Sequence, residues 1–138
     1  MTFDIKINEP ISVDQFLKVL KASSLGERRP IEDIECIEGM LKNSNLIVTA
    51  WAENELIGIA RSITDFHYAC YLSDLAVESK YQKSGVGRSL QIATQKQLGP
   101  KCKLILIAAP AANSYYEHIG FKNNPRCWVL ERHEGICS

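Results

Sequence analysis

The chain has 138 residues, of which 46% are hydrophobic and 23% are charged, so it is long enough for one domain with a buried core. Its 16 basic and 16 acidic residues cancel, which argues against a nucleic-acid partner or an anionic membrane surface. No apolar run approaches the roughly 20 residues of a membrane span. The five cysteines contain no CxxC pair and follow no signal peptide, which predicts reduced thiols in a cytoplasmic protein without a metal site.

The first third of the chain carries one strand signal and two helix signals. Phe3–Ile7 (FDIKI) alternates apolar and polar residues, as a half-buried strand does. Ser12 and Gln15 have the spacing of a capping box for a first helix, which we expect to end at Gly26. Pro30 is expected to open a second helix after a polar connection.

Three strands are predicted next, at Leu46–Ala52, Leu56–Ile63 and Tyr68–Val77. The polar residues 53–55 predict a hairpin turn between the first two of them. Gly58 inside the second strand indicates a bulge or a close backbone approach. These three consecutive strands are expected to be antiparallel neighbours.

A turn at Gln82–Gly87 follows the last of these strands directly, and a helix is expected from about residue 86 to residue 98. The continuous apolar run Lys103–Ala109 (KLILIAA) is typical of a strand covered on both faces. Strand, helix and strand in this order predict a βαβ unit with parallel strands.

The end of the chain predicts two more elements. Pro110 is expected to open a short helix that ends at Gly120, with Phe121 packing back on its last turn. Trp128–Arg132 is expected to form a final strand. The sequence therefore predicts a mixed α/β fold.

The glycine turn indicates an anion site. A helix start leaves backbone N–H groups unpaired at the positive end of the helix dipole, and Lys80, Lys83 and Arg88 lie close by in sequence. A Walker A loop would need Lys before Ser89, where Arg88 stands, and a dinucleotide fingerprint would need glycine at Leu90. Both nucleotide motifs are therefore excluded, and a pyrophosphate-bearing cofactor of another kind is expected.

Two motifs carry a family resemblance. Gln82, Gly85 and Gly87 match the Gln/Arg-x-x-Gly-x-Gly/Ala pattern of the acetyl-CoA loop in the GCN5-related N-acetyltransferases (GNAT). About 30 residues later, Tyr115–Phe121 (YYEHIGF) resembles the Phe/Tyr-Tyr-x-x-x-Gly-Phe motif of the same family. The order and separation of the two motifs are also those of the family.

The resemblance implies a single N-acetyltransferase domain over residues 1–138 with a three-layer fold. Its mixed, mostly antiparallel sheet would splay near the cofactor loop, where the parallel βαβ unit lies. The implied reaction moves an acetyl group from acetyl-CoA, with no metal, directly to a primary amine of a small molecule or peptide. The residues implied to contact the cofactor are Leu75, Ala76, Val77, Gln82, Lys83, Ser84, Gly85, Val86, Gly87, Arg88 and Ser89.

The resemblance also implies catalytic positions. Tyr116 lies where the family often places the general acid for the thiolate, although it equally suits a packing role on the apolar stripe of its helix. Asp74 is the candidate general base, directly or through water, and Glu78 or a water chain are alternatives. Arg28 and Arg29 fall in the segment that helps to line the acceptor pocket in the family.

The sequence does not identify the acceptor amine. Trp51, Phe66, Tyr68 and Tyr71 would suit an aromatic or aliphatic amine, but aromatic residues in strands are usually core. Two other functions remain: a CoA-sensing or partner-binding module that lost the chemistry, and a nucleic-acid binder, which the zero net charge disfavours. The protein is also a candidate homodimer.

Overall fold

The computed structural model describes residues 2–137, which divide after Leu106 into two compact units. The first unit holds a five-stranded sheet and three α-helices, and the second holds one α-helix. In chain order the elements are β1 (Asp4–Ile7), α1 (Val13–Lys21), the 3-10 helix η1 (Ser24–Arg28), α2 (Ile34–Lys42), β2 (Leu46–Ala52), β3 (Glu55–Thr64), β4 (Ala69–Val77), the 3-10 helix η2 (Ser79–Tyr81), α3 (Val86–Lys96), β5 (Lys103–Ile105), the 3-10 helix η3 (Pro110–Ala112) and α4 (Asn113–His118). The extension of one domain over both units stays a prediction.

The sheet has the strand order β1-β2-β3-β4-β5. Neighbours from β1 to β4 are antiparallel, and β5 runs parallel to β4. This arrangement confirms the predicted mixed, mostly antiparallel sheet and the predicted βαβ unit, in which α3 connects β4 to β5.

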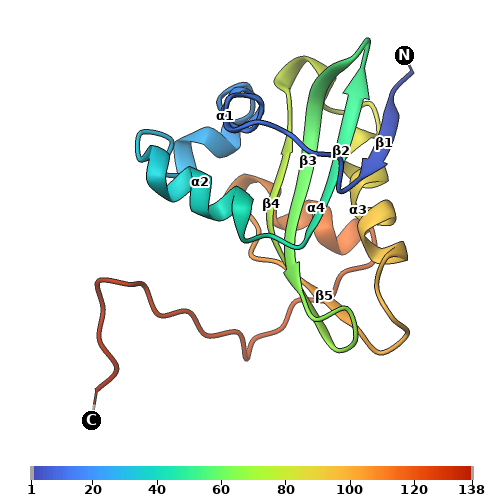
Figure 1. The fold of residues 1–138 in the computed structure, drawn as a ribbon. Helices are drawn as coiled ribbons and strands as arrows, with labels where there is room; N and C mark the ends of the chain where they lie inside the picture. The colour runs from blue at the N-terminus through green and yellow to red at the C-terminus, as the bar shows by residue number, and fades with distance from the viewer. Residues whose placement is uncertain (1, 138) are drawn as a thin grey trace. The chain divides into compact units, whose positions relative to one another are not determined.

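Helices cover both faces of the sheet, as Figure 1 shows for α1 and α2 on one side and α3 on the other. Ile59 and Ala60 are successive residues of β3, so their side chains point to opposite faces. Ile59 is buried in the core cluster that contains Phe16 of α1, whereas Ala60 is buried in the cluster that contains Leu90 of α3. The first unit therefore has the three layers that the sequence predicted.

The predicted hairpin is confirmed, with a two-residue turn. Glu53 and Asn54 both have positive φ, at 52° and 66°. This is the backbone of a type I′ turn, whose twist suits two antiparallel strands. Glu55 therefore belongs to β3 rather than to the turn.

The capping box of α1 is confirmed, but its predicted end is wrong. The Gln15 N–H donates to the Ser12 hydroxyl over 3.1 Å, and the Ser12 N–H donates to the Gln15 side chain over 2.8 Å. The helix ends at Lys21, and Gly26 lies in η1. A Cβ on Gly26 would lie 2.7 Å from the Leu20 carbonyl oxygen, so the glycine permits a close backbone approach instead of ending the helix.

The predicted start of α2 at Pro30 is also wrong. The helix begins at Ile34, because the Asp33 carboxylate accepts a hydrogen bond from the Cys36 N–H over 3.0 Å and caps the first turn. Residues 30–32 form a turn before it.

The predicted strand Lys103–Ala109 is shorter than expected. β5 ends at Ile105, which pairs with Tyr71, and the side chain of Ile105 is partly exposed rather than covered. Ser73 on β4 is an extra residue in the β3–β4 ladder, since Ser62 pairs with Leu72 and the next pair joins Arg61 to Asp74. A bulge of this kind increases local twist, which explains why β5 stops following β4 there.

In the second unit, the predicted helix end is confirmed and the predicted final strand is wrong. Gly120 has φ of +108° just after α4, and the Phe121 N–H donates to the Tyr116 carbonyl over 3.0 Å. The rings of Tyr116 and Phe121 meet edge to face, 5.5 Å between centroids. Trp128–Arg132 forms no strand, since residues 107–137 contain no strand with which its backbone could pair.

Both alternatives that the sequence indicated for Gly58, a bulge and a close backbone approach, are present in the structure. The register between β2 and β3 shifts beside it, because Ala50 pairs with Gly58 and Trp51 pairs with Leu56. A Cβ on Gly58 would lie 3.1 Å from Leu90 Cδ1 and 3.2 Å from Val86 Cγ1. The glycine thus lets α3 pack closely on the sheet.

We expect Gly58→Val to destabilise the fold by about 1–3 kcal/mol, because its side chain would overpack the contact with α3. Urea denaturation followed by circular dichroism would measure the loss. Gly39→Val in α2 is the control, since no atom lies within 4 Å of a Cβ there. Equal stability of the two variants would contradict the role of Gly58 in helix packing.

Candidate functional site

The turn before α3 presents unpaired backbone donors. Gly85 precedes the helix with φ of +88°, a left-handed conformation that favours glycine, and no side chain caps the helix. The first intrahelical bond joins the Ser89 N–H to the Gly85 carbonyl over 3.0 Å. The N–H groups of residues 86–88 therefore have no intrahelical acceptor and face the start of the helix, where an anion is stabilised.

Gly87 is not required by the fold itself. Its φ lies outside the left-handed region, and a Cβ there would meet only Val77 Cγ2 at 3.7 Å, an ordinary van der Waals contact. A side chain at this position would instead project where a ligand approaches the backbone. Internal packing therefore does not account for the glycine at this position.

Side chains of the turn fix it to the end of β4. The Gln82 amide nitrogen donates to the Val77 carbonyl over 3.0 Å, and the Ser84 hydroxyl donates to the Tyr81 carbonyl. Lys83 holds a positive φ of 63°. The side chains of Gln82 and Ser84 thus shape the loop, which leaves ligand contacts mainly to the backbone.

Positive charge gathers at the same turn. The Lys80 ammonium lies 3.6 Å from the Glu78 carboxylate and 5.4 Å from the centre of the Tyr81 ring. Lys83 and Arg88 form no ion pair with any residue between 2 and 137. Two cations therefore remain free to balance an anion at the helix start.

Leu75, Ala76 and Val77 lie on β4 immediately before this turn. On one side they pair with Ala60, Ile59 and Gly58 of β3. On the other side the ladder to β5 covers only residues 69–71 of β4, so within the first unit this edge has no strand partner. The Val77 carbonyl accepts from Gln82, and the other backbone groups on this edge have no strand partner within the first unit.

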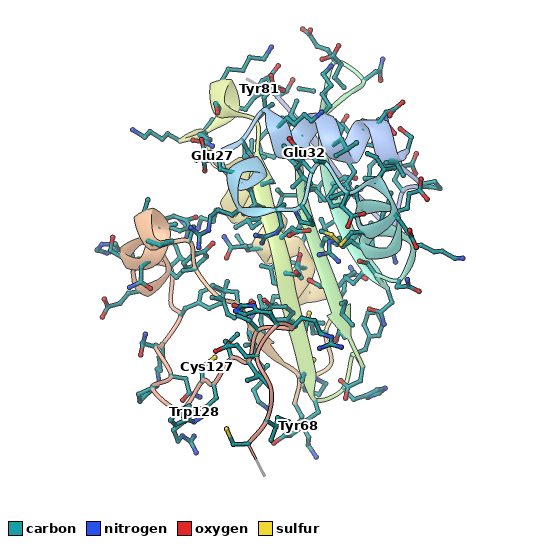
Figure 2. The ribbon with its side chains drawn as sticks, turned by 90° about the vertical axis from the view of Figure 1, so that its left-hand side faces the viewer. Glu27, Glu32, Tyr68, Tyr81, Cys127 and Trp128 are labelled. Carbon is teal, nitrogen blue, oxygen red and sulfur yellow. The ribbon has the colours of Figure 1, made fainter. Side chains whose placement is uncertain are left out.

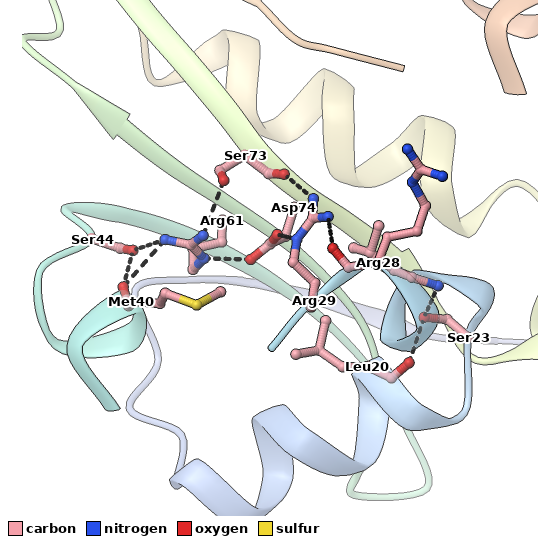
Figure 3. Close-up of polar contacts among 10 residues, drawn as sticks. Leu20, Ser23, Arg28, Arg29, Met40, Ser44, Arg61, Ser73 and Asp74 are labelled. Carbon is pink, nitrogen blue, oxygen red and sulfur yellow. Dashed lines mark hydrogen bonds and ion pairs between the residues drawn. The ribbon is translucent and has the colours of Figure 1, made fainter. Parts of the chain in front are cut away.

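Asp74 is the centre of a buried ion-pair network, shown in Figure 3. Its side chain is fully buried, with one carboxylate oxygen 2.5 Å from Arg29 Nε and the other 2.5 Å from Arg61 Nε. Arg29 also donates to the Ser73 carbonyl over 2.7 Å, and Arg61 donates to the Ser73 hydroxyl over 3.0 Å. The bulge at Ser73 therefore supplies acceptors to both arginines.

Arg61 also reaches α2 and the connection between α2 and β2. Its Nη1 atom donates to the Ser44 hydroxyl over 2.9 Å and to the Met40 carbonyl over 3.2 Å. Sequence reasoning placed Arg29 in the segment that lines the acceptor pocket in the family, and it missed Arg61. The sequence did contain a signal for Arg61, because an arginine inside the apolar run of β3 would be buried and would need a partner of opposite charge.

The role of general base predicted for Asp74 is not tested by these contacts, but they favour a different one. Both oxygens already accept charged hydrogen bonds, so protonation would weaken two buried ion pairs. Glu78, the alternative base, follows β4 and keeps a partly exposed side chain beside Lys80.

Tyr116 lies in the middle of α4, in the second unit. Burial raises the pKa of its phenol above the usual 10, and the neighbouring Tyr115 adds to the shift. The phenol therefore stays protonated through the neutral range. Its ring contacts with Tyr115 and Phe121 also give it a packing role, so both interpretations of Tyr116 are retained.

Residues 2–137 contain neither a cluster of metal-ligating side chains nor a membrane-spanning helix. Within residues 2–137, no three His, Cys, Asp or Glu side chains gather as metal ligands would. The helices described there are all too short or too polar to span a bilayer.

These features define an α/β protein in which an uncapped helix start with free cations lies beside the unpaired edge of β4. The family model for the acetyltransferase (GNAT) domain matches residues 19–127, well over half of the chain. The protein belongs to the GNAT acetyltransferase family.

Relatives and solved structures agree with this assignment. The chain is 27% identical over 101 residues to an uncharacterized N-acetyltransferase, ycf52, of Gracilaria tenuistipitata var. liui, covering 71% of this chain and 56% of the relative. It thus spans little more than half the length of the curated relatives that it matches.

Two crystal structures share the fold at lower identity. A probable acetyltransferase from meticillin-resistant Staphylococcus aureus superposes with a TM-score of 0.74 at 22% identity, over 93% of this chain and 98% of that one. The aminoglycoside N-acetyltransferase AAC(6')-Iy, solved with a bisubstrate analogue containing CoA, has a TM-score of 0.71 at 17% identity, over 96% and 99% of the two chains.

We expect Asp74→Asn to destabilise the protein by about 3–5 kcal/mol, because the buried guanidinium of Arg61 and the partly buried guanidinium of Arg29 would lose their carboxylate partner. Urea denaturation measures the change in the free energy of unfolding. Asp4→Asn, an isosteric change at an exposed position of β1, is the control. A loss below about 1 kcal/mol for Asp74→Asn would contradict the structural role of the network.

Proposed function

We propose that this protein is an N-acetyltransferase that moves an acetyl group from acetyl-CoA directly to a primary amine of a small molecule or peptide. The observation that carries the proposal is Gly87, a glycine at an anion-binding helix start that neither backbone strain nor internal packing requires. Membership of the GNAT family supports the same activity.

The residues present fit the pyrophosphate of CoA. The N–H groups of residues 86–88 would donate to phosphate oxygens, and Lys83 and Arg88 would balance their charge. The open edge of β4 at residues 75–77 would receive the pantetheine arm and the acetyl carbonyl through backbone groups. Acetyl-CoA, when bound, supplies the activated thioester.

Side chains of this protein would donate a proton to the departing thiolate and remove one from the amine. Tyr116 is the proposed general acid, because its raised pKa keeps the phenolic proton in place until a thiolate leaves. For the base, the accessible carboxylate of Glu78 or a water beside it suits proton removal better than Asp74, whose oxygens are occupied.

A second candidate is a CoA-sensing or partner-binding module that has lost the chemistry. The observation in its favour is the occupied carboxylate of Asp74, which leaves the strand before the glycine turn without a free buried base. This module would need the glycine turn but would not need the hydroxyl of Tyr116.

Gly87→Leu tests the cofactor site. We expect its Kd for acetyl-CoA to rise at least about tenfold, which is about 1.4 kcal/mol, because the side chain would block the approach of phosphate to the backbone. Calorimetric titration with acetyl-CoA measures binding, and ATP is the ligand control. Gly39→Leu on α2 should leave the Kd unchanged. Wild-type protein that binds neither acetyl-CoA nor CoA would remove the functional proposal.

Tyr116→Phe tests the chemistry. We expect kcat to fall about 100-fold while acetyl-CoA binding persists, because the proton donor is lost and the ring is kept. CoA release from a panel of amines measures turnover, and Tyr115→Phe is the matched control. In the wild type, loss of the acid through Tyr116 ionisation should occur only above the usual pKa of 10. Unchanged kcat would exclude Tyr116 as the acid.

A further inference from the structure

An apolar row crosses three strands of the sheet. Ile63 of β3 pairs with Tyr71 of β4, and Tyr71 pairs with Ile105 of β5, so the three side chains point to the same face. They are 51%, 38% and 38% exposed, respectively. Apolar side chains that line up in this way, open to solvent, form a surface on which a ligand could be buried.

The row continues the face that α1 and α2 cover. Along β3, Ile59, Arg61 and Ile63 alternate onto this face, and Ile59 is buried under α1 and α2. Arg61 comes next with its ion pair to Asp74, and Ile63 lies beyond the helices. The face thus changes from a buried core, through a charged layer, to the exposed row.

The charged layer has more positive than negative charge. Asp74 is the only carboxylate within 4 Å of Arg29 or Arg61 in the described chain, so the three groups carry a net charge of one positive unit. Arg29 uses three of its five N–H donors, to Asp74, Arg28 and Ser73. Two N–H groups of this guanidinium, which is 22% exposed, have no protein acceptor within residues 2–137.

A second cation flanks the row at its other end. Lys103 of β5 shares the face of Ile105, and its ammonium lies 3.5 Å from the centre of the Tyr68 ring. The connection between α1 and α2 carries the exposed acids Glu27 and Glu32. Figure 2 places both toward the Tyr81 end of this face, away from Tyr68. The exposed Asp65 carboxylate, which accepts from the N–H groups of His67, Tyr68 and Ala69, lies at the same end and offsets Lys103. The net positive charge beside the row therefore comes from the Arg29 side, which matches an apolar ligand that carries a negative charge there.

We propose that the acceptor is an amine that also carries a carboxylate and an apolar group, as an amino acid with an apolar side chain does. The apolar group would cover Ile63, Tyr71 and Ile105, and the carboxylate would accept from the free N–H groups of Arg29. This inference rests on the proposed function, which places the acetyl group at residues 75–77, where the amine would attack it.

The spacing along β4 suits such a ligand. Tyr71 and Asp74 lie opposite Ile63 and Arg61, which are two residues apart on β3 because Ser73 is an extra residue, so the separation is about 7 Å at 3.3 Å per residue. This is the scale of one amino acid with a large side chain. A carboxylate between the apolar row and the reacting edge would therefore lie beside Arg29.

The test is calorimetric titration of the CoA-saturated protein with N-acetyl-L-phenylalanine, which is a product of the expected reaction. We expect it to bind at least tenfold more tightly than N-acetyl-L-phenylalanine amide, which lacks the charge, and than N-acetylglycine, which lacks the apolar group. Equal affinities, or no binding of the acid by protein that binds CoA, would overturn the inference and leave the proposed function standing. Failure to bind CoA itself would overturn both.

Variants test the apolar row and the guanidinium of Arg29 separately. Ile63→Glu should weaken binding of N-acetyl-L-phenylalanine at least tenfold, because it removes an apolar contact and adds a repelling charge. Ile92→Glu is the matched control, since Ile92 is 45% exposed on α3, which packs on the opposite face. Arg29→Gln should abolish the preference for the acid over the amide, and Arg29→Lys should retain it. Equal binding by the two glutamate variants, or a preserved preference in Arg29→Gln, would contradict the inference.

Discussion

The buried carboxylate of Asp74 is the constraint on which the arrangement of the first unit depends. A charged group without solvent is costly unless its charge and its hydrogen bonds are satisfied, and here two guanidinium groups do both. Because Arg29 follows η1 and Arg61 lies on β3 and reaches Met40 of α2, one carboxylate joins three segments to β4. The helices on this face are thus held in register with the strand that leads to the glycine turn.

The bulge at Ser73 links this network to the open edge of the sheet. The extra residue turns its carbonyl and hydroxyl toward Arg29 and Arg61, so the irregularity is stabilised by charged hydrogen bonds. Beyond the bulge, β5 no longer pairs with β4, and residues 75–77 keep a free edge beside the anion site. A local defect in one ladder therefore provides the opening that an acyl donor needs.

The sequence predicted the features that depend on local chemistry. The capping box at Ser12, the turn at residues 53 and 54, and the glycine before α3 each follow from the residues beside them. The start of α2 was misplaced because Asp33, a better cap, competes with Pro30. The Asp74 network could not be predicted in full, because its partners Arg29 and Arg61 lie 45 and 13 residues away in sequence and meet only in the folded sheet.

The two glycines of the turn show how a structure separates folding from binding. Gly85 is explained by its φ of +88°, which a side chain would strain whether or not a ligand binds. Gly87 has no such reason within the protein, because its backbone is ordinary and a Cβ would find only a normal contact with Val77. Because this residue choice has no internal cause and stands at a helix start with free donors and free cations, we infer that its cause is a bound ligand. By the same reasoning we infer a ligand over Ile63, Tyr71 and Ile105, because the exposure of these three side chains contributes nothing to the core.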